Sequence, residues 1–138
     1  MVEPIRKLIK SAAKSIDQHN ETMMADYHLT RMQSAVLDFL AGQKNHQANQ
    51  HVLEKEWNIR RSTTTVMVQR LEKRGLVTRK PDPQDKRQKI VILTKKAEEL
   101  VPGIKNVIKE EDLDLQRKFS SEDLDTVRKI LKYICEKG

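Results

Sequence analysis

Cysteine, aromatic residues and long apolar runs are scarce in this sequence of 138 residues, and each scarcity excludes a class of function. The single Cys135 rules out a disulfide within the chain, so a reducing cytoplasm is the expected location. Five aromatic side chains are too few for a platform that stacks single-stranded nucleic acid. No apolar run approaches the roughly 18 residues of a membrane span, and Met1–Ile16 is too charged for a signal peptide.

Patterns typical of enzymes and metal sites are also lacking. We find no nucleophile paired with a base and no glycine-rich loop for a phosphate, so we expect neither an enzyme nor a cofactor. His19 and His28 are nine residues apart, His46 and His51 are five apart, and the last two predicted helices contain no histidine. This spacing disfavours a zinc site.

Positive charge is concentrated in one segment. The formal net charge is +7, and residues 45–94 supply +6 of it, from 11 Lys and Arg against 5 Asp and Glu. Residues 1–44 sum to +1 and residues 95–138 to zero. A run of charge is usually a solvated surface, but a localised footprint is what binding to a polyanion requires. The charge pattern therefore indicates a nucleic acid as partner.

The first part of the chain is predicted to be helical. Apolar residues at helical spacing run from about Pro4 to Ala25. A second helix opens at Thr30, whose hydroxyl can accept from the amide of Gln33 in a capping box, and it ends at Gly42. Its expected core face consists of Met32, Ala35, Val36, Phe39 and Leu40.

A short third helix should begin after Asn49 and turn Val52, Leu53 and Trp57 inward. A tight turn at Asn58-Ile59 then leads into a fourth helix that ends at Gly75.

Two short strands, Val77–Lys80 and Lys89–Leu93, are rich in β-branched residues and should form a two-stranded wing. Pro81 and Pro83 lack amide donors, so they should keep the loop between the strands out of the sheet.

Two further helices should follow the wing. Thr94 caps a long helix that Pro102-Gly103 should kink or break, and Ser120 caps a last helix.

These elements predict a mainly α fold with a small β-wing (α+β), a winged helix-turn-helix in a single domain. Residues 29–96 would form the DNA-binding winged helix-turn-helix, called here the reading head. The helices of residues 1–28 and 97–138 carry apolar stripes that are not required to fill the core of the reading head. We expect these outer helices to pack against a second copy as dimerisation helices. Such a homodimer would bind the two half-sites of an inverted-repeat operator in double-stranded DNA, which lie roughly 34–36 Å apart.

The fourth helix is the expected reader of the major groove. Its core face would be Thr64, Met67, Val68 and Leu71, and its groove face Ser62, Thr63, Val66 and Gln69. Arg60 and Arg61 at its start can bind guanine bidentately or hold phosphates, and the sequence leaves both open. Arg70, Lys73 and Arg74 fit backbone contacts or solvated surface.

The loop of the wing carries Asp85, Lys86 and Arg87 beyond two prolines, so its tip should be short and stiff. An extended Arg87, with Lys86 beside it, can enter a narrow minor groove of A·T-rich sequence. Asp85 would repel phosphate, so its better role is to brace an arginine or the wing backbone. The alternative is an ordinary surface ion pair.

Together these motifs resemble the MarR family of bacterial winged helix-turn-helix regulators over essentially the whole chain. The elements that carry the resemblance are Leu29-Thr30-x-x-Gln33, R-S-T-x-T with R-L-E-K-R-G-L-V through Val77, and D-P-x-D-x-R followed by Leu93-Thr94. The resemblance implies a MarR-like homodimer, recognition helices in successive major grooves, wing arginines in minor grooves, and repression of a nearby promoter.

Carried over by position, Arg87 matches the wing-tip arginine of the family and Asp85 its wing-bracing aspartate, while Ser62 and Thr63 match helix positions that commonly meet DNA. Val66 departs from the family, because many relatives have a DNA-contacting arginine there. A thymine methyl is the natural partner for valine. Ala97 stands where glycine is usual in the family, and alanine favours the helix.

Many relatives release DNA when a small aromatic effector binds near the dimer helices. In this chain His19, Met23, Met24 and Tyr27 would face that site, although core packing alone also explains them. Cys135 is expected to be a packed thiol rather than a redox sensor. The alternative function is an architectural or RNA-binding winged helix that recognises no operator.

Overall fold

The computed structural model describes residues 2–23 and 27–137. The chain forms two compact units, Met1–Ile104 and Lys105–Gly138, and the boundary falls within helix α5 (Lys95–Lys118). Among the described residues, no helix is both long enough and apolar enough to cross a membrane.

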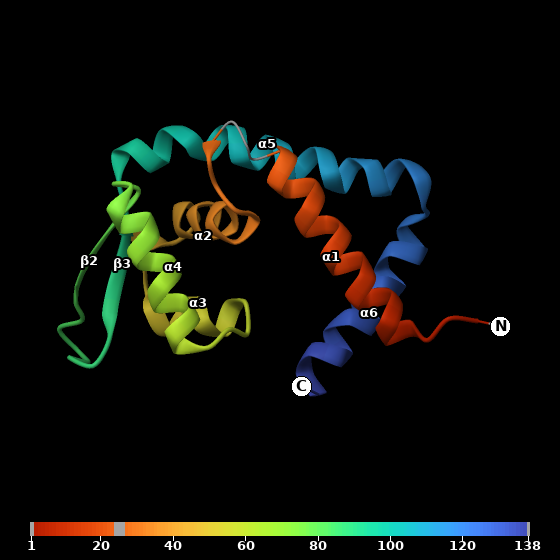
Figure 1. Ribbon diagram of the computed structural model, residues 1–138, viewed down its shortest axis with the longest axis horizontal. Coiled ribbons are helices and arrows are strands. Elements are labelled where there is room, and N and C mark those ends of the chain that lie inside the picture. Colours follow the sequence, from red (N-terminus) through yellow and green to blue (C-terminus); the bar gives the residue numbers. More distant parts are fainter. Residues whose placement is uncertain (1, 24–26, 138) are drawn as a thin grey trace. The chain divides into compact units, whose positions relative to one another are not determined.

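The first unit contains α-helices α1 to α4, with a 3-10 helix (Lys44–His46) and strand β1 (Gln47–Asn49) between α2 and α3 (Figure 1). They are α1 (Ile5–Met23), α2 (Arg31–Ala41), α3 (Gln50–Glu56) and α4 (Arg61–Lys73). The sequence predicted α1 to continue to Ala25, but residues 24–26 lie outside the described part of the chain.

The predicted helix caps are confirmed. Thr30 Oγ1 accepts from the amide of Gln33 at 3.1 Å, and the Gln33 side chain accepts from the amide of Thr30 at 3.0 Å. Asn49 accepts from the amide of His51 at 2.8 Å, which begins α3. These bonds satisfy backbone donors that the first turn of a helix leaves free, so the caps determine where each helix begins.

The wing belongs to a three-stranded antiparallel sheet in the order β1-β3-β2, not to the two-stranded one predicted. Strands β2 (Val77–Pro81) and β3 (Lys89–Leu93) were expected, and β2 includes Pro81 as an edge residue. The additional strand is β1 (Gln47–Asn49), which pairs with β3. Its residues have little strand propensity of their own, so only pairing with β3 makes them a strand.

The core of the first unit lies among α2, α3, α4, the sheet and the first turns of α5. Its largest fully buried side chains are Val36, Leu37, Leu40, Leu53, Val68, Leu71, Leu76, Val77, Val91 and Ile104. Leu37 was missed by the sequence analysis, whereas Val52, predicted to point inward, is 41% exposed. Because α3 has only two turns, it buries a narrow face around Leu53, and Val52 falls beside it.

The sequence predicted a kink or a break at Pro102-Gly103; helix α5 runs without interruption through both residues, so the break is wrong. Thr94 caps this helix as expected, accepting from the amide of Ala97 at 3.2 Å.

The second unit consists of the rest of α5 and α6 (Ser121–Lys137), capped by Ser120 as predicted. Within its described residues no side chain is fully buried. Cys135 is exposed in this chain, which corrects the expected packed thiol.

Candidate nucleic-acid interface

Helix α4 presents two faces of opposite character. Thr64, Val68 and Leu71 are completely buried and Met67 nearly so. The side chains predicted for the groove face are all exposed, namely Ser62, Thr63, Val66 and Gln69. A hydrogen bond of 2.7 Å from Gln50 Nε2 to Thr65 Oγ1 connects α3 with α4 and holds the angle between the two helices. The predicted faces of the helix are therefore correct, while contact of the exposed face with DNA stays a prediction.

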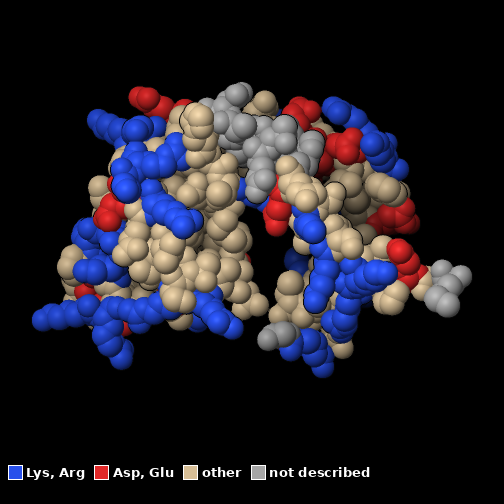
Figure 2. Space-filling model, viewed as in Figure 1, with Lys and Arg blue, Asp and Glu red and all other residues tan. Residues whose placement is uncertain are grey.

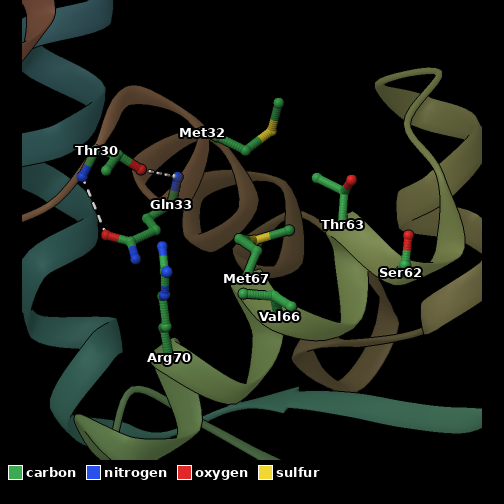
Figure 3. A pocket seen from close by; sticks show the side chains of 8 residues that line it. All are labelled: Thr30, Met32, Gln33, Ser62, Thr63, Val66, Met67 and Arg70. Carbon is green, nitrogen blue, oxygen red and sulfur yellow. Dashed lines mark hydrogen bonds between the residues drawn. The ribbon is translucent and has the colours of Figure 1, made fainter.

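An open groove of about 460 Å³ lies along the exposed face of α4 and the start of α2 (Figure 3). It is lined by Thr30, Met32, Gln33, Ser62, Thr63, Val66, Met67 and Arg70. Val66 is 46% exposed and lies beside Met67 in the groove, with Met32 further along the lining (Figure 3). In Figure 3 the side chain of Arg70 points toward the Gln33 end of the groove. The groove thus has three apolar side chains, Met32, Val66 and Met67, among polar ones, with a cation near one end.

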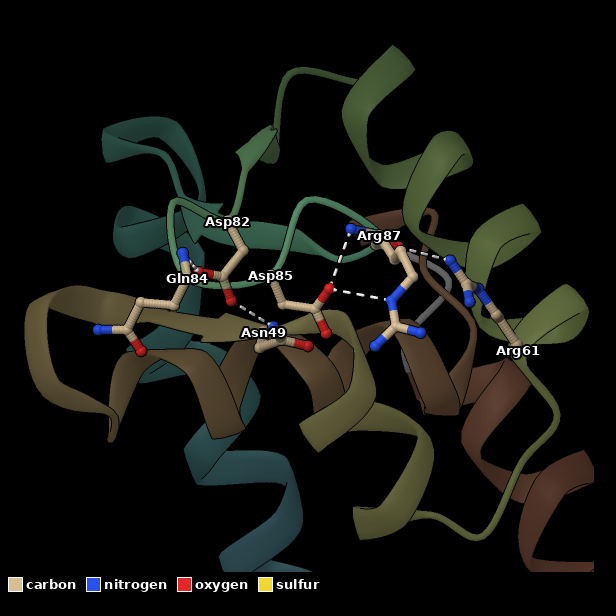
Figure 4. A network of polar contacts seen from close by, with 6 residues as sticks. All are labelled: Asn49, Arg61, Asp82, Gln84, Asp85 and Arg87. Atoms are coloured by element: carbon tan, nitrogen blue, oxygen red, sulfur yellow. Dashed lines mark hydrogen bonds and ion pairs between the residues drawn. The ribbon is translucent and has the colours of Figure 1, made fainter.

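The loop of the wing is held by two aspartates (Figure 4). Asp85 Oδ1 accepts from the amide of Arg87 at 3.1 Å and from Arg87 Nε at 3.3 Å. Asp82 accepts from Asn49 Nδ2 at 2.7 Å and from the amide of Gln84 at 2.9 Å. Because Asn49 belongs to β1, its hydrogen bond to Asp82 attaches the loop to the sheet.

The contacts from Arg87 also affect the charge of Asp85. The bond from the backbone amide of Arg87, then the bond from its side chain, lower the pKa of Asp85 below its ordinary 3.8, and the charge of Arg61 adds a smaller effect. The carboxylate is therefore ionised at neutral pH. Its bracing contribution is fully present above the ordinary pKa and is lost only as pH falls through the lowered one.

Arg61 connects helix α4 to the wing. Its Nη2 donates to the backbone carbonyl of Arg87 at 2.7 Å (Figure 4). The sequence analysis considered only bases and phosphates as partners of Arg61. It missed this contact because no local pattern relates two residues that are 26 positions apart.

The remaining cations of the site are exposed. Arg60 is the N-terminal capping residue of α4, and Lys86 and Arg87 lie at the wing, where the Arg87 side chain is 87% exposed. Figure 2 shows one face of the molecule, and Lys and Arg side chains gather over the part of it that α4 and the wing form. This distribution gives duplex DNA a cationic surface with a helix and a loop projecting from it.

The other candidate residues are placed differently. The Arg74 guanidinium donates to the backbone carbonyls of Tyr27 and His28, so this side chain is not simply solvated surface. Tyr27 is half-buried in the connection between α1 and α2. The side chains of His19, Met23 and Met24 lie outside the described part of the structure. Among the described residues, no three His, Cys, Asp or Glu side chains gather as a metal site would require.

Comparison with known proteins agrees with this geometry. The sequence profile of the MarR family matches residues 27–88. The transcription regulator MarR from Oenococcus oeni PSU-1 is 32% identical, with a TM-score of 0.82 over 96% of this chain and 99% of that one. Sco3205 of Streptomyces coelicolor, a MarR family transcriptional regulator solved in complex with DNA, is 25% identical, with a TM-score of 0.81 over 96% of this chain and 84% of that one. The HTH-type transcriptional regulator YcgE of Bacillus subtilis is 28% identical over 75 residues, which are 54% of this chain and 49% of that protein.

The fold and the exposed cationic surface define a winged helix-turn-helix protein that binds DNA. The chain belongs to the MarR family of transcriptional regulators. This is a family of regulators and not of enzymes.

Proposed function

We propose that this chain is a homodimeric repressor that binds an inverted-repeat operator near a promoter and releases it when a small aromatic effector binds. The observation that carries the proposal is the bond from Arg61 to the carbonyl of Arg87, which joins the recognition helix to the braced wing. The two elements then present one surface to adjacent grooves. In this proposal Ser62, Thr63, Val66 and Gln69 read the major groove, and Lys86 and Arg87 the minor groove.

Exposed apolar side chains support the homodimer. On α1, Ile5, Leu8 and Ile16 are 59%, 46% and 44% exposed. On α6, Val127, Ile130, Leu131 and Tyr133 are between 38% and 58% exposed. Apolar area gains about 25 cal/mol for each Å² removed from water, so stripes of this kind favour a second copy that covers them.

The site of the effector is proposed at the connection between α1 and α2. Tyr27 lies there, and His19 and Met23 precede it in the sequence. Titration of the protein–operator complex with a panel of phenols and aromatic acids tests this part. If no compound releases the DNA, the effector is not of this class.

Selection of bound fragments from random duplex DNA tests the proposed function itself. We expect the purified protein to run near twice 16.1 kDa and to enrich an inverted repeat, because two identical heads must meet two identical half-sites. A stable monomer at micromolar concentration that binds an asymmetric site would contradict the dimer. Equal binding to all duplexes, or preference for RNA, would favour an architectural or RNA-binding protein.

Asp85→Ala should weaken DNA binding, although it removes a negative charge from a cationic surface. Without this carboxylate the amide and the side chain of Arg87 lose their acceptor, and the wing tip becomes less ordered. We expect a smaller loss than for removal of Arg87 itself, measured by titration of the selected operator. Glu56→Ala is the matched control, since it removes an exposed acid from α3 without loosening the wing. Tighter binding by Asp85→Ala would show that the aspartate only repels DNA.

A further inference from the structure

Arg74 ends the recognition helix and bonds to a distant part of the chain. It is the C-terminal capping residue of α4, and Gly75 next to it adopts a positive φ of 73° that turns the chain into β2. Its guanidinium donates to two successive backbone carbonyls, to Tyr27 at 2.9 Å and to His28. The residues joined in this way are 46 and 47 positions apart.

The two carbonyls belong to the connection between α1 and α2, and its conformation is unusual. His28 has a φ of 54°, in the left-handed region that residues other than glycine rarely adopt. Such a conformation persists only where neighbouring contacts enforce it. The planar fork of an arginine can serve two adjacent acceptors at once, whereas the single ammonium group of lysine lacks that geometry.

Helix α5 holds the same junction from a second side. The Tyr27 ring lies against Gly103, where an added Cβ would collide with the tyrosine hydroxyl and lie 3.0 Å from its Cζ atom. Lys96 Nζ donates to the backbone carbonyl of Arg74 at 3.0 Å, and Thr94 Oγ1 to that of Gly75 at 2.8 Å. The end of α4 is therefore bonded to the α1–α2 connection and to the first turn of α5 at once.

From these contacts we infer that Arg74 is a positioning residue for DNA recognition, which holds the recognition helix to the α1–α2 connection rather than binding phosphate. The inference rests on the proposed function, because it concerns how the helix meets an operator. Without the fork of Arg74, the C-terminal end of α4 would keep its core contacts and its bonds to Thr94 and Lys96, but it would lose its attachment to the α1–α2 connection. With Arg74 in place, both ends are tied, and the positions of Val66 and Gln69 in the groove follow from the two attachments.

The substitution Arg74→Lys separates positioning of the helix from binding of phosphate, because lysine keeps the positive charge but lacks the planar guanidinium group that can donate to both carbonyls. We expect about a tenfold loss of affinity for the selected operator, because the helix that these bonds no longer hold must be ordered on binding, at a cost limited by the free energy of the lost bonds. We also expect weaker discrimination among half-site variants and a salt dependence equal to that of the parent protein. Lys73→Ala is the control for charge, since it removes the neighbouring exposed cation and should leave discrimination unchanged.

Gly103→Ala provides a second variant that alters no charge. It should displace Tyr27 and loosen the same connection, with the same loss of discrimination, although alanine favours the helix itself. Faster hydrogen exchange in the last turn of α4 would accompany both changes. Parent-like affinity and discrimination in Arg74→Lys, or in a folded Gly103→Ala, would overturn the inference and leave the proposed function intact. Failure of the proposed function would instead appear in the parent protein, as binding without preference for any duplex.

Discussion

Replacing Arg87 with alanine should cause the largest loss of DNA binding of any single substitution in the wing. Its side chain is 87% exposed, and Asp85 contacts it only at Nε, so the two terminal nitrogens are free to enter a minor groove. A groove contact of this kind is worth about 1–3 kcal/mol, and a dimer loses one at each wing. We expect the loss to be greatest on operators that are A·T-rich beneath the wing, where the groove is narrow and most negative.

Titrations at several salt concentrations measure this effect. Each lost contact should reduce the magnitude of the slope of log K against log salt concentration by about 1, because one phosphate counterion fewer is released per wing. Arg87→Lys keeps the positive charge. Its salt slope should therefore be close to that of the parent protein, whereas its preference for A·T-rich flanks should be weaker. Lys44→Ala, which removes an exposed cation outside the site, is the control. Parent-like binding by Arg87→Ala would show that the wing does not read DNA.

Val66→Arg should change specificity rather than only affinity. Val66 is 46% exposed on the predicted groove face of α4. A guanidinium there can take the O6 and N7 atoms of guanine, so preference should shift toward guanine at one half-site position by about 1–3 kcal/mol. Binding to the native operator should weaken, because the packing of valine against a thymine methyl is lost.

A panel of half-site variants measures the shift. Val52→Arg is a matched control, because it adds the same cation at a valine of α3 that is 41% exposed. The control should raise affinity for all duplexes alike, whereas Val66→Arg should change their order. If Val66→Arg also acts uniformly, the arginine contacts phosphate. If neither affinity nor discrimination changes, Val66 lies outside the groove.

Much of the fold and of the candidate surface could be predicted from the sequence, because the signals are local. The capping box of Thr30 and Gln33, the cap at Asn49 and the turn at Gly75 each depend on a few adjacent residues. The period of α4 likewise separates buried Leu71 from exposed Val66. Such patterns determine where helices begin and end and which face meets the core.

Only the tertiary structure decided the contacts between segments far apart in the chain. Gln47–Asn49 becomes a strand because β3 lies beside it, and Val52 is exposed because α3 is too short to bury a wider face. Arg61 and Arg74 look like free cations in the sequence, yet their guanidinium groups bond to backbone carbonyls 26 and 46–47 residues away. A backbone carbonyl is present at every residue, so the sequence carries no mark of which one an arginine will reach. Folding alone brings that acceptor into place.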